Sequence, residues 1–201
     1  MGEQAESWRV EQPMVLDPIL AAALAAFYEQ GYHGTPVRDI ARRVGVTVPA
    51  LYYHHANKEA ILVALLDRIT RDFIDRARAA DVEAGEDVVQ RLRLVVESIA
   101  LGMTWRPELA SLQPEMRYLS DEKHAEQAAV RDELEGLLAQ IVAEGVDLGA
   151  FRVHDVAGTV RALLGMLHWI TTWFQRGGEL SPDQIATQYA DHACRLVGAA
   201  R

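Results

Sequence analysis

The stretch TPVRDIARRVGVTVPALYYHHANK, residues 35–58, decides the fold that we predict for this chain. Thr35 is a suitable N-cap, and Pro36 suits the first helical position because its missing N–H has no intrahelical partner there. Apolar residues then recur at helical spacing as far as Val44. Gly45 can adopt the left-handed conformation that ends a helix. The spacing therefore predicts a short helix that ends at Val44.

A second short helix is predicted directly afterwards, over Val48–His54. Val46 is expected to fill the corner between the two helices, and Thr47 is a suitable N-cap. Leu51 should point inward. The residues expected to face outward are Val48, Pro49, Ala50, Tyr53 and His54. Two helices joined at a steep angle by a glycine-containing turn describe a helix-turn-helix, whose second helix can lie in the DNA major groove.

The residues around this turn have a spacing found in one family of regulators. Gly45-Val46-Thr47 precedes Pro49, Leu51-Tyr52-Tyr53-His54 follows, and Asn57-Lys58-Glu59 completes the pattern. The match is dense from Leu20 to Leu66 and resembles the tetracycline-repressor (TetR) family. The resemblance implies an N-terminal DNA-binding domain followed by a helical domain that senses a ligand and forms a homodimer. A plain helical hairpin is the alternative, but it gives no reason for the cluster of tyrosines and histidine.

The resemblance assigns roles to the residues of the second helix and its flanks. Val48 and Ala50 suit thymine methyl groups, and His54 can form a hydrogen bond with a guanine or an adenine. Side chains on either side would fix the protein on phosphates. The candidate DNA-binding residues are Thr35, Thr47, Val48, Pro49, Ala50, Tyr52, Tyr53, His54 and Lys58.

Two positions depart from the family's pattern. Asp17-Pro18 stands where many members carry an Arg or Lys near the start of the first helix, which removes an expected phosphate contact. His55 stands where an aromatic or aliphatic residue is usual, and packing in the core is favoured over DNA contact for its side chain.

Composition and charge limit the classes of protein to which this chain can belong. A chain of 201 residues with a single cysteine, Cys194, has no internal disulfide, which is typical of a reducing compartment. The apolar run Ile19–Phe27 is too short to span a bilayer, so we expect a cytoplasmic protein without a membrane partner. The first 60 residues hold five basic and seven acidic side chains, although DNA-binding domains are usually basic. We therefore expect few phosphate contacts and a weak dependence of binding on salt.

The chain is predicted to be all-α, with about nine helices. We expect a disordered leader over residues 1–14, a helix-turn-helix domain over 15–62, and a ligand-binding and dimerisation domain over 63–201. Besides the two short helices, the predicted helices are one from Asp17-Pro18 to Gly31, then Lys58–Ala79, Glu86–Met103, Pro107–Gln113, one from Ser120 or Asp121 to Glu144, one from Asp155 to Phe174, and one from Ser181-Pro182 to Val197.

No catalytic or metal-binding pattern stands out. The chain has no G-x-S-x-G motif and no Gly-rich phosphate loop, and Asp121-x-x-His124 is a single, incomplete version of a di-iron motif. His54 and His55 are adjacent, so they point to different faces of a helix and cannot form a zinc pair. We therefore expect neither enzymatic activity nor a cofactor.

Bulky, adaptable side chains beyond the helix-turn-helix predict a small-molecule pocket. The candidate ligand-binding residues are Met103, Trp105, Glu115, Met116, Tyr118, His124, His168, Trp169 and Trp173. For each of them, packing in the core is the alternative. The segment from Trp169 to Tyr189 also resembles TetR-type regulators that respond to acyl-CoA thioesters, although Thr172 replaces an Arg expected before the second Trp; Arg161 or Arg176 could take its place. The resemblance implies an apolar effector with one anionic end.

The last two predicted helices carry apolar stripes that two chains could bury together. The stripe residues are Val156, Val160, Leu163, Leu164, Leu167, Ile170, Ile185, Tyr189, His192 and Leu196, with burial in their own chain as the alternative. The whole pattern predicts a ligand-responsive repressor that binds a palindromic operator as a homodimer and releases it when a small apolar effector binds. A transcriptional activator of the same fold, or an all-α ligand-binding protein that does not bind DNA, remains open.

Overall fold

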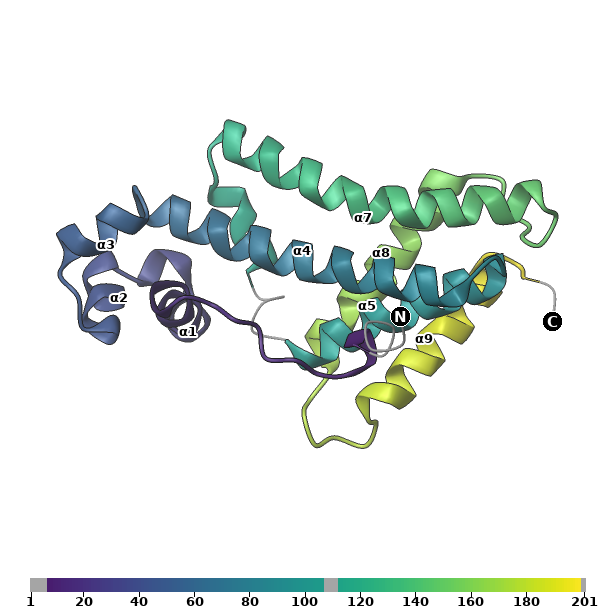
Figure 1. The fold of residues 1–201 in the computed structure, drawn as a ribbon, viewed down its shortest axis with the longest axis horizontal. Coiled ribbons are helices and arrows are strands. Elements are labelled where there is room, and N and C mark those ends of the chain that lie inside the picture. Colours follow the sequence, from purple (N-terminus) through teal and green to yellow (C-terminus); the bar gives the residue numbers. More distant parts are fainter. Residues whose placement is uncertain (1–6, 107–111, 200–201) are drawn as a thin grey trace. The chain divides into compact units, whose positions relative to one another are not determined.

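The structure, a computed structural model, describes residues 7–106 and 112–199. Within them the chain forms eight α-helices and two 3-10 helices and contains no strand, which confirms the all-α prediction (Figure 1). In chain order the elements are η1 (Ser7–Arg9), α1 (Pro18–Gly34), α2 (Val37–Val44), α3 (Val48–His54), α4 (Lys58–Ala84), α5 (Val88–Trp105), η2 (Gln113–Tyr118), α7 (Asp121–Asp147), α8 (Val156–Trp173) and α9 (Pro182–Leu196). Most of the helix expected over Pro107–Gln113 lies outside the described residues.

The chain divides into two compact units, each with its own packing. The helix-turn-helix unit contains residues 13–70 and the described part of 108–130. The C-terminal unit contains the described residues of 1–12, 71–107 and 131–201. The boundary lies within α4, between Thr70 and Arg71, where we expected a boundary along the fourth helix but nearer to residue 62.

Side-chain caps set the start of several helices. The Asp17 carboxylate accepts hydrogen bonds from the backbone N–H groups of Ile19 (2.9 Å) and Leu20 (3.0 Å) at the start of α1. Asn57 caps α4 through the N–H of Ala60 at 2.7 Å. Near the end of α1, Gly31 adopts a φ of 73° and kinks the helix, which continues to Gly34, whereas we predicted that the helix ends at Gly31.

Thr35 does not cap α2, contrary to our prediction. Pro36 occupies the N-cap position and makes no side-chain cap hydrogen bond. The Thr35 hydroxyl instead donates to the carbonyl oxygens of Ala26 (3.0 Å) and Gly31 (2.8 Å), and the residue is fully buried. The connection from α1 to α2 is so short that this threonine completes the end of the first helix rather than the start of the second.

Helix α5 forms the centre of the C-terminal unit and packs against both α8 and α9. The inner faces of α8 and α9 are buried there. Val160, Leu163, Leu167, Ile170 and Ile185 are all fully buried in their own chain. The stripe that we predicted for dimerisation is therefore wrong for these five residues, because α5 already covers the most apolar faces of the two helices.

The expected disordered leader is also wrong in its described part. Ser7–Arg9 forms a 3-10 helix, and Trp8 is 1% exposed. A tryptophan buried to this extent places the segment among the packed parts of the C-terminal unit.

Candidate DNA-binding site

The structure confirms the two predicted helices of the helix-turn-helix and the turn between them. Gly45 ends α2 with a φ of 80°, which is left-handed, and its N–H donates to the carbonyls of Ala41 (3.0 Å) and Arg42 (3.2 Å). Thr47 then caps α3 by accepting a hydrogen bond from the N–H of Ala50 at 3.3 Å. Val46 is 37% exposed, so the prediction that it fills the corner is wrong.

Helix α3 rests on one inward residue and presents the rest of its surface outward. Leu51 is fully buried, whereas Tyr52 is 43% exposed and Tyr53 is 88% exposed. The other outward residues of α3 and its cap are Thr47, Pro49, Ala50 and His54, with Val48 half-buried. Two large aromatic rings and a histidine are thus exposed together on one short helix. Clustered exposed apolar surface of this kind is typical of a site that contacts a ligand or partner.

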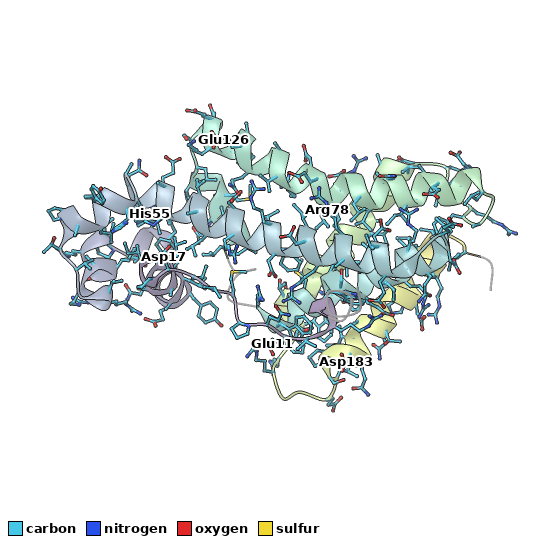
Figure 2. The ribbon with its side chains drawn as sticks, in the orientation of Figure 1. Glu11, Asp17, His55, Arg78, Glu126 and Asp183 are labelled. Atoms are coloured by element: carbon cyan, nitrogen blue, oxygen red, sulfur yellow. The ribbon has the colours of Figure 1, made fainter. Side chains whose placement is uncertain are left out.

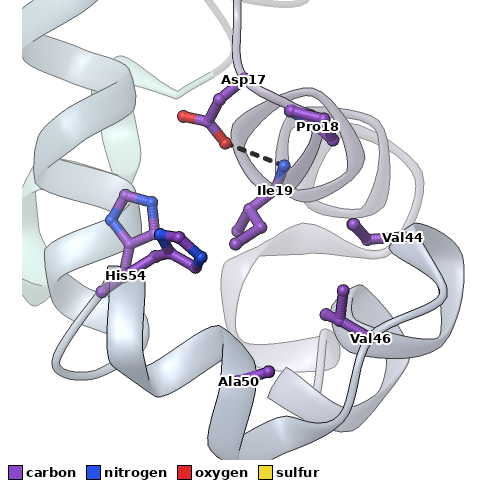
Figure 3. A pocket seen from close by; sticks show the side chains of 8 residues that line it. Asp17, Pro18, Ile19, Val44, Val46, Ala50 and His54 are labelled. Atoms are coloured by element: carbon purple, nitrogen blue, oxygen red, sulfur yellow. Dashed lines mark hydrogen bonds between the residues drawn. The ribbon is translucent and has the colours of Figure 1, made fainter.

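A hollow of about 480 Å³ lies beside the outward face of α3. Figure 3 shows Ala50 and His54 from α3 on one side and Asp17 to Ile19 at the start of α1 on the other. The remaining lining residues are Val44, Val46 and His55. Figure 2 places His55 just after α3. Its side chain is half-buried and lines this hollow, so it is neither fully packed in the core nor fully exposed for a DNA contact.

Lys58 lies at the start of α4 and is bound to the end of α1. Its ammonium donates to the backbone carbonyls of Tyr32 (2.5 Å) and Thr35 (2.9 Å) and lies 4.3 Å from the centroid of the Tyr32 ring. Burial lowers the pKa of Lys58, and the nearby Glu115 carboxylate opposes this shift. An ammonium has three N–H donors, so one remains for a phosphate. Thr35, by contrast, is buried with its hydroxyl engaged, and its predicted phosphate contact is wrong.

Arginines on α2 add positive charge that our sequence-based list of DNA-binding residues missed. Arg38 is exposed, and the side chain of Arg42 is 76% exposed despite its ion pair with Asp39 at 3.2 Å. Arg43 is held by Glu29 at 2.5 Å, and hydrogen bonding from Arg43 lowers the pKa of that carboxyl. The i, i+4 spacing of Arg38 and Arg42 was the signal in the sequence, since it places both on one side of the helix.

The segment after α5 belongs in part to the helix-turn-helix unit. The Tyr118 ring in η2 lies 4.0 Å from the His33 ring at the end of α1, measured between centroids. The Ser120 N–H donates to the Glu59 carboxylate at 2.6 Å. Tyr118, predicted to line a ligand pocket, therefore packs on the end of α1.

The other predicted ligand-binding residues are divided between the two units. Glu115, Met116, Tyr118 and His124 belong to the helix-turn-helix unit, and Met103, Trp105, His168, Trp169 and Trp173 belong to the C-terminal unit. Met116 and Trp105 are each 7% exposed, whereas Trp169 is 61% exposed on the outward side of α8. A side chain as exposed as Trp169 is unsuited to line an enclosed pocket within one chain.

One hollow in the C-terminal unit does contain a predicted residue. It has a volume of about 420 Å³ and is lined by Trp105, Phe174, Arg176 and the turn that leads into α9. Arg176 donates to the Trp105 carbonyl oxygen and forms an ion pair with Glu11 at 3.1 Å. The hollow thus combines aromatic surface with one guanidinium and two carboxylates, those of Glu11 and Glu179.

Comparisons with known proteins agree with this geometry. The family described as "Bacterial regulatory proteins, tetR family" matches residues 19–65, and "Tetracyclin repressor-like, C-terminal domain" matches residues 85–197, which is more than half of the chain. The chain belongs to the TetR family. This TetR-family regulator therefore has both domains of the family, and the all-α helix-turn-helix prediction is confirmed.

Three proteins are similar to this chain in sequence or in structure. The HTH-type transcriptional repressor KstR2 from Mycolicibacterium smegmatis is 27% identical over 179 residues, covering 86% of this chain and 85% of its own. A tetR-family regulatory protein from Rhodococcus RHA1 superposes with a TM-score of 0.83 at 25% identity over the full length of both chains. AibR, solved with isovaleryl coenzyme A and operator DNA, superposes with a TM-score of 0.79 at 25% identity, covering 98% of this chain and 100% of its own.

The family and these relatives are transcriptional regulators rather than enzymes. Among the described side chains, no group of three or more His, Cys, Asp or Glu residues could hold a metal ion. No helix in the described part of the chain is long and apolar enough to cross a membrane.

Proposed function

We propose that this TetR-family regulator is a transcriptional repressor that binds a palindromic operator and releases it when a small apolar effector binds. The outward face of α3 carries the proposal, because it presents Tyr53, His54 and Ala50 together on a helix fixed by one buried leucine. A relative named as a repressor, and a structural neighbour solved with operator DNA, support the same function for this chain.

The residues of α3 and its flanks divide into two groups on DNA. Val48, Pro49, Ala50, Tyr53 and His54 are proposed to read base edges in the major groove. Thr47, Tyr52, Lys58, Arg38 and Arg42 are proposed to contact phosphates, which positions the helix without reading sequence. Thr35 leaves this list because its hydroxyl is buried.

A homodimer is proposed to form through the outward faces of α8 and α9. On α8 the exposed residues are Arg161, Ala162, Gly165, His168, Trp169, Thr172 and Trp173. On α9, Leu196 is 47% exposed and His192 is also exposed. Small residues beside the two exposed tryptophans suit close packing of helices. A two-fold dimer would present two copies of α3 to the two halves of a palindrome.

An acyl-type molecule with an anionic end is proposed as the effector. The hollow next to Trp105 and Phe174 offers aromatic surface, and a carboxylate or phosphate of the effector would pair with the Arg176 guanidinium by displacing Glu11. The neighbour solved with isovaleryl coenzyme A supports this class of ligand. The effector releases DNA only if it binds more tightly to a state that fits the operator poorly.

The test begins with genomic fragments that the purified protein retains. Sequencing identifies the operator, and fluorescence anisotropy then measures its release by fatty acyl-CoAs, steroid-derived CoA thioesters, free acids and cationic dyes. We expect a CoA thioester or a free acid to release the operator. In a reporter assay, we expect the gene to be repressed when that effector is absent. Release by the dyes alone, lost in Glu179→Gln, which removes a carboxylate that lines the hollow, would reject the acyl-type effector. Activation of the reporter would assign the chain to the activators instead.

The basic residues are tested by the salt dependence of binding. Lys58→Ala or Arg42→Ala should weaken binding to every DNA sequence alike and lower the slope of log affinity against log salt by about one unit. An unchanged slope for either variant removes that residue from the phosphate-contacting group.

A further inference from the structure

The segment Ser7–Gln12 is fastened to the C-terminal unit by its side chains. Trp8 is 1% exposed, and its indole N–H donates to the Glu83 carboxylate on α4 at 2.7 Å. Arg9 donates to both oxygens of the same carboxylate, at 2.5 and 2.6 Å. Figure 2 shows Glu11 in the same segment, where it pairs with Arg176 at 3.1 Å.

Two buried arginines hold the backbone of this segment. Arg76 donates to the carbonyl oxygens of Trp8 (3.1 Å) and Val10 (3.3 Å), and Arg106 donates to that of Gln12 at 2.6 Å. Each arginine is 8% exposed, and both pair with Asp72, at 3.0 and 2.8 Å.

The segment therefore supplies hydrogen-bond acceptors to buried donors of the C-terminal unit. Two buried guanidiniums, Arg76 and Arg106, share the one Asp72 carboxylate, so their other N–H groups depend on carbonyl oxygens of the segment. If the segment departed, these donors would lose buried acceptors, which is costly for charged groups. The contacts thus favour a segment that stays bound.

The bound segment lies very close in sequence to the DNA-reading elements. Gln12, whose carbonyl Arg106 holds, is five residues before Asp17, so the chain between them spans at most about 17 Å. Asp17 caps α1 and lines the hollow next to α3 (Figure 3). Fixing Gln12 therefore restricts where the start of α1 can move, in addition to the connection through α4.

We propose that Ser7–Gln12 is a strap that ties the start of the helix-turn-helix unit to the C-terminal unit, and that release of the strap lowers operator affinity. An untied unit has more conformational freedom, and DNA binding must remove that freedom. The operator part of this proposal rests on the proposed DNA-binding function, whereas the restraint on α1 does not.

Full-length protein with Glu83→Gln or Trp8→Ala tests the strap, and Glu133→Gln is the matched control because it breaks the Arg78 ion pair on the same helix α4. Brief trypsin treatment with mass spectrometry measures cleavage after Arg9. Hydrogen exchange measures protection of residues 13–34. Anisotropy measures the affinity for the retained operator. Circular dichroism confirms that each variant is folded.

We expect cleavage after Arg9 to be at least tenfold faster in both strap variants, exchange in residues 13–34 to increase, and operator affinity to fall three- to tenfold. The control should stay within twofold of wild type in all three. Because coupling is reciprocal, saturating operator should slow the cleavage of wild type by the factor by which strap release weakens binding.

Faster cleavage with unchanged exchange and unchanged operator affinity would overturn the proposal, because the segment would then be only structural. Wild-type cleavage as fast as that of the folded strap variants would also overturn it. If Trp8→Ala does not fold, Glu83→Gln decides. If wild type retains no DNA, the proposed function fails, and the exchange of residues 13–34 still decides the strap.

Discussion

Two residues of α3 that lie two positions apart have opposite roles, and this difference can be measured. Leu51 is fully buried, so Leu51→Ala should lower the free energy of unfolding by about 2–5 kcal/mol. Tyr53 is 88% exposed, so Tyr53→Ala should change that free energy by no more than about 0.5 kcal/mol while reducing the preference for operator over random DNA. Thermal unfolding and competition binding check the pair. Equal destabilisation by the two substitutions would contradict this placement of α3.

Glu97 on α5 provides a prediction of pH dependence. Burial raises the pKa of Glu97 above its ordinary 4.5; Arg93 and Arg9 oppose the rise, and Asp191 and Glu83 add to it. The folded state therefore binds this proton more tightly than the unfolded state does. The resulting contribution to stability is present at low pH and is lost as the pH rises through the pKa of the folded state.

Replacing this carboxyl with an amide removes the titration. We consider the free energy of unfolding of wild type minus that of Glu97→Gln. This difference should decrease as the pH rises from about 4, where an ordinary carboxyl titrates, toward neutrality. Urea unfolding at a series of pH values measures this difference. A difference that stays constant or increases with pH would show that burial does not raise the pKa of Glu97.

At the residue scale, the sequence predicts caps well when one helix end is involved. Asp17, Thr47 and Asn57 cap the helices that their positions indicated. Thr35 was misassigned because the end of α1 and the start of α2 compete for its hydroxyl. Local sequence does not show which of two adjacent helix ends such a side chain will satisfy.

At the scale of elements, periodicity located the helices but not what covers each face. The last two helices run nearly as predicted, over Val156–Trp173 and Pro182–Leu196. Their apolar stripe was assigned to a second chain, and the structure shows that α5 covers much of it. An apolar stripe shows that burial is required, and the partner depends on tertiary packing that one sequence does not reveal.

Two glycines in helices give a matched pair of substitutions. A Cβ on Gly102 of α5 would lie 2.4 Å from Cε1 of Phe73, so Gly102→Ala forces that ring to move and should destabilise the fold by about 1–3 kcal/mol. A Cβ on Gly136 of α7 meets no atom within 4 Å, so Gly136→Ala should stabilise it by about 0.5–1 kcal/mol. Thermal unfolding measures both. Stabilisation by Gly102→Ala would contradict the packing of Phe73.

At the scale of the whole molecule, assembly and folding can be separated on α8. Trp169 is 61% exposed, so Trp169→Glu should give folded monomers if the outward face forms the dimer. Leu167 is fully buried, so Leu167→Glu should instead unfold the chain, because an unpaired buried carboxylate is very costly. Sedimentation and circular dichroism report the two outcomes. A folded dimer with Trp169→Glu would contradict this interface.

The sequence predicted the exposed face of α3 better than the positions of the candidate ligand-binding residues. Reading DNA needs consecutive residues of one short helix, so spacing alone placed Tyr53 and His54 correctly on its exposed side. A pocket needs residues from several helices, and composition cannot place these in space. Met116 and Trp105, both predicted for one pocket, belong to different units.

The central claim is that the outward face of α3 reads a palindromic operator. Selection from random DNA duplexes with wild type, Tyr53→Ala and His54→Ala tests it at the level of single bases. We expect wild type to enrich two inverted half-sites centred about 10 base pairs, or a multiple of that, apart, and each variant to lose preference at the same positions in both halves. An enriched site without two-fold symmetry, or one that neither variant changes, would contradict the claim.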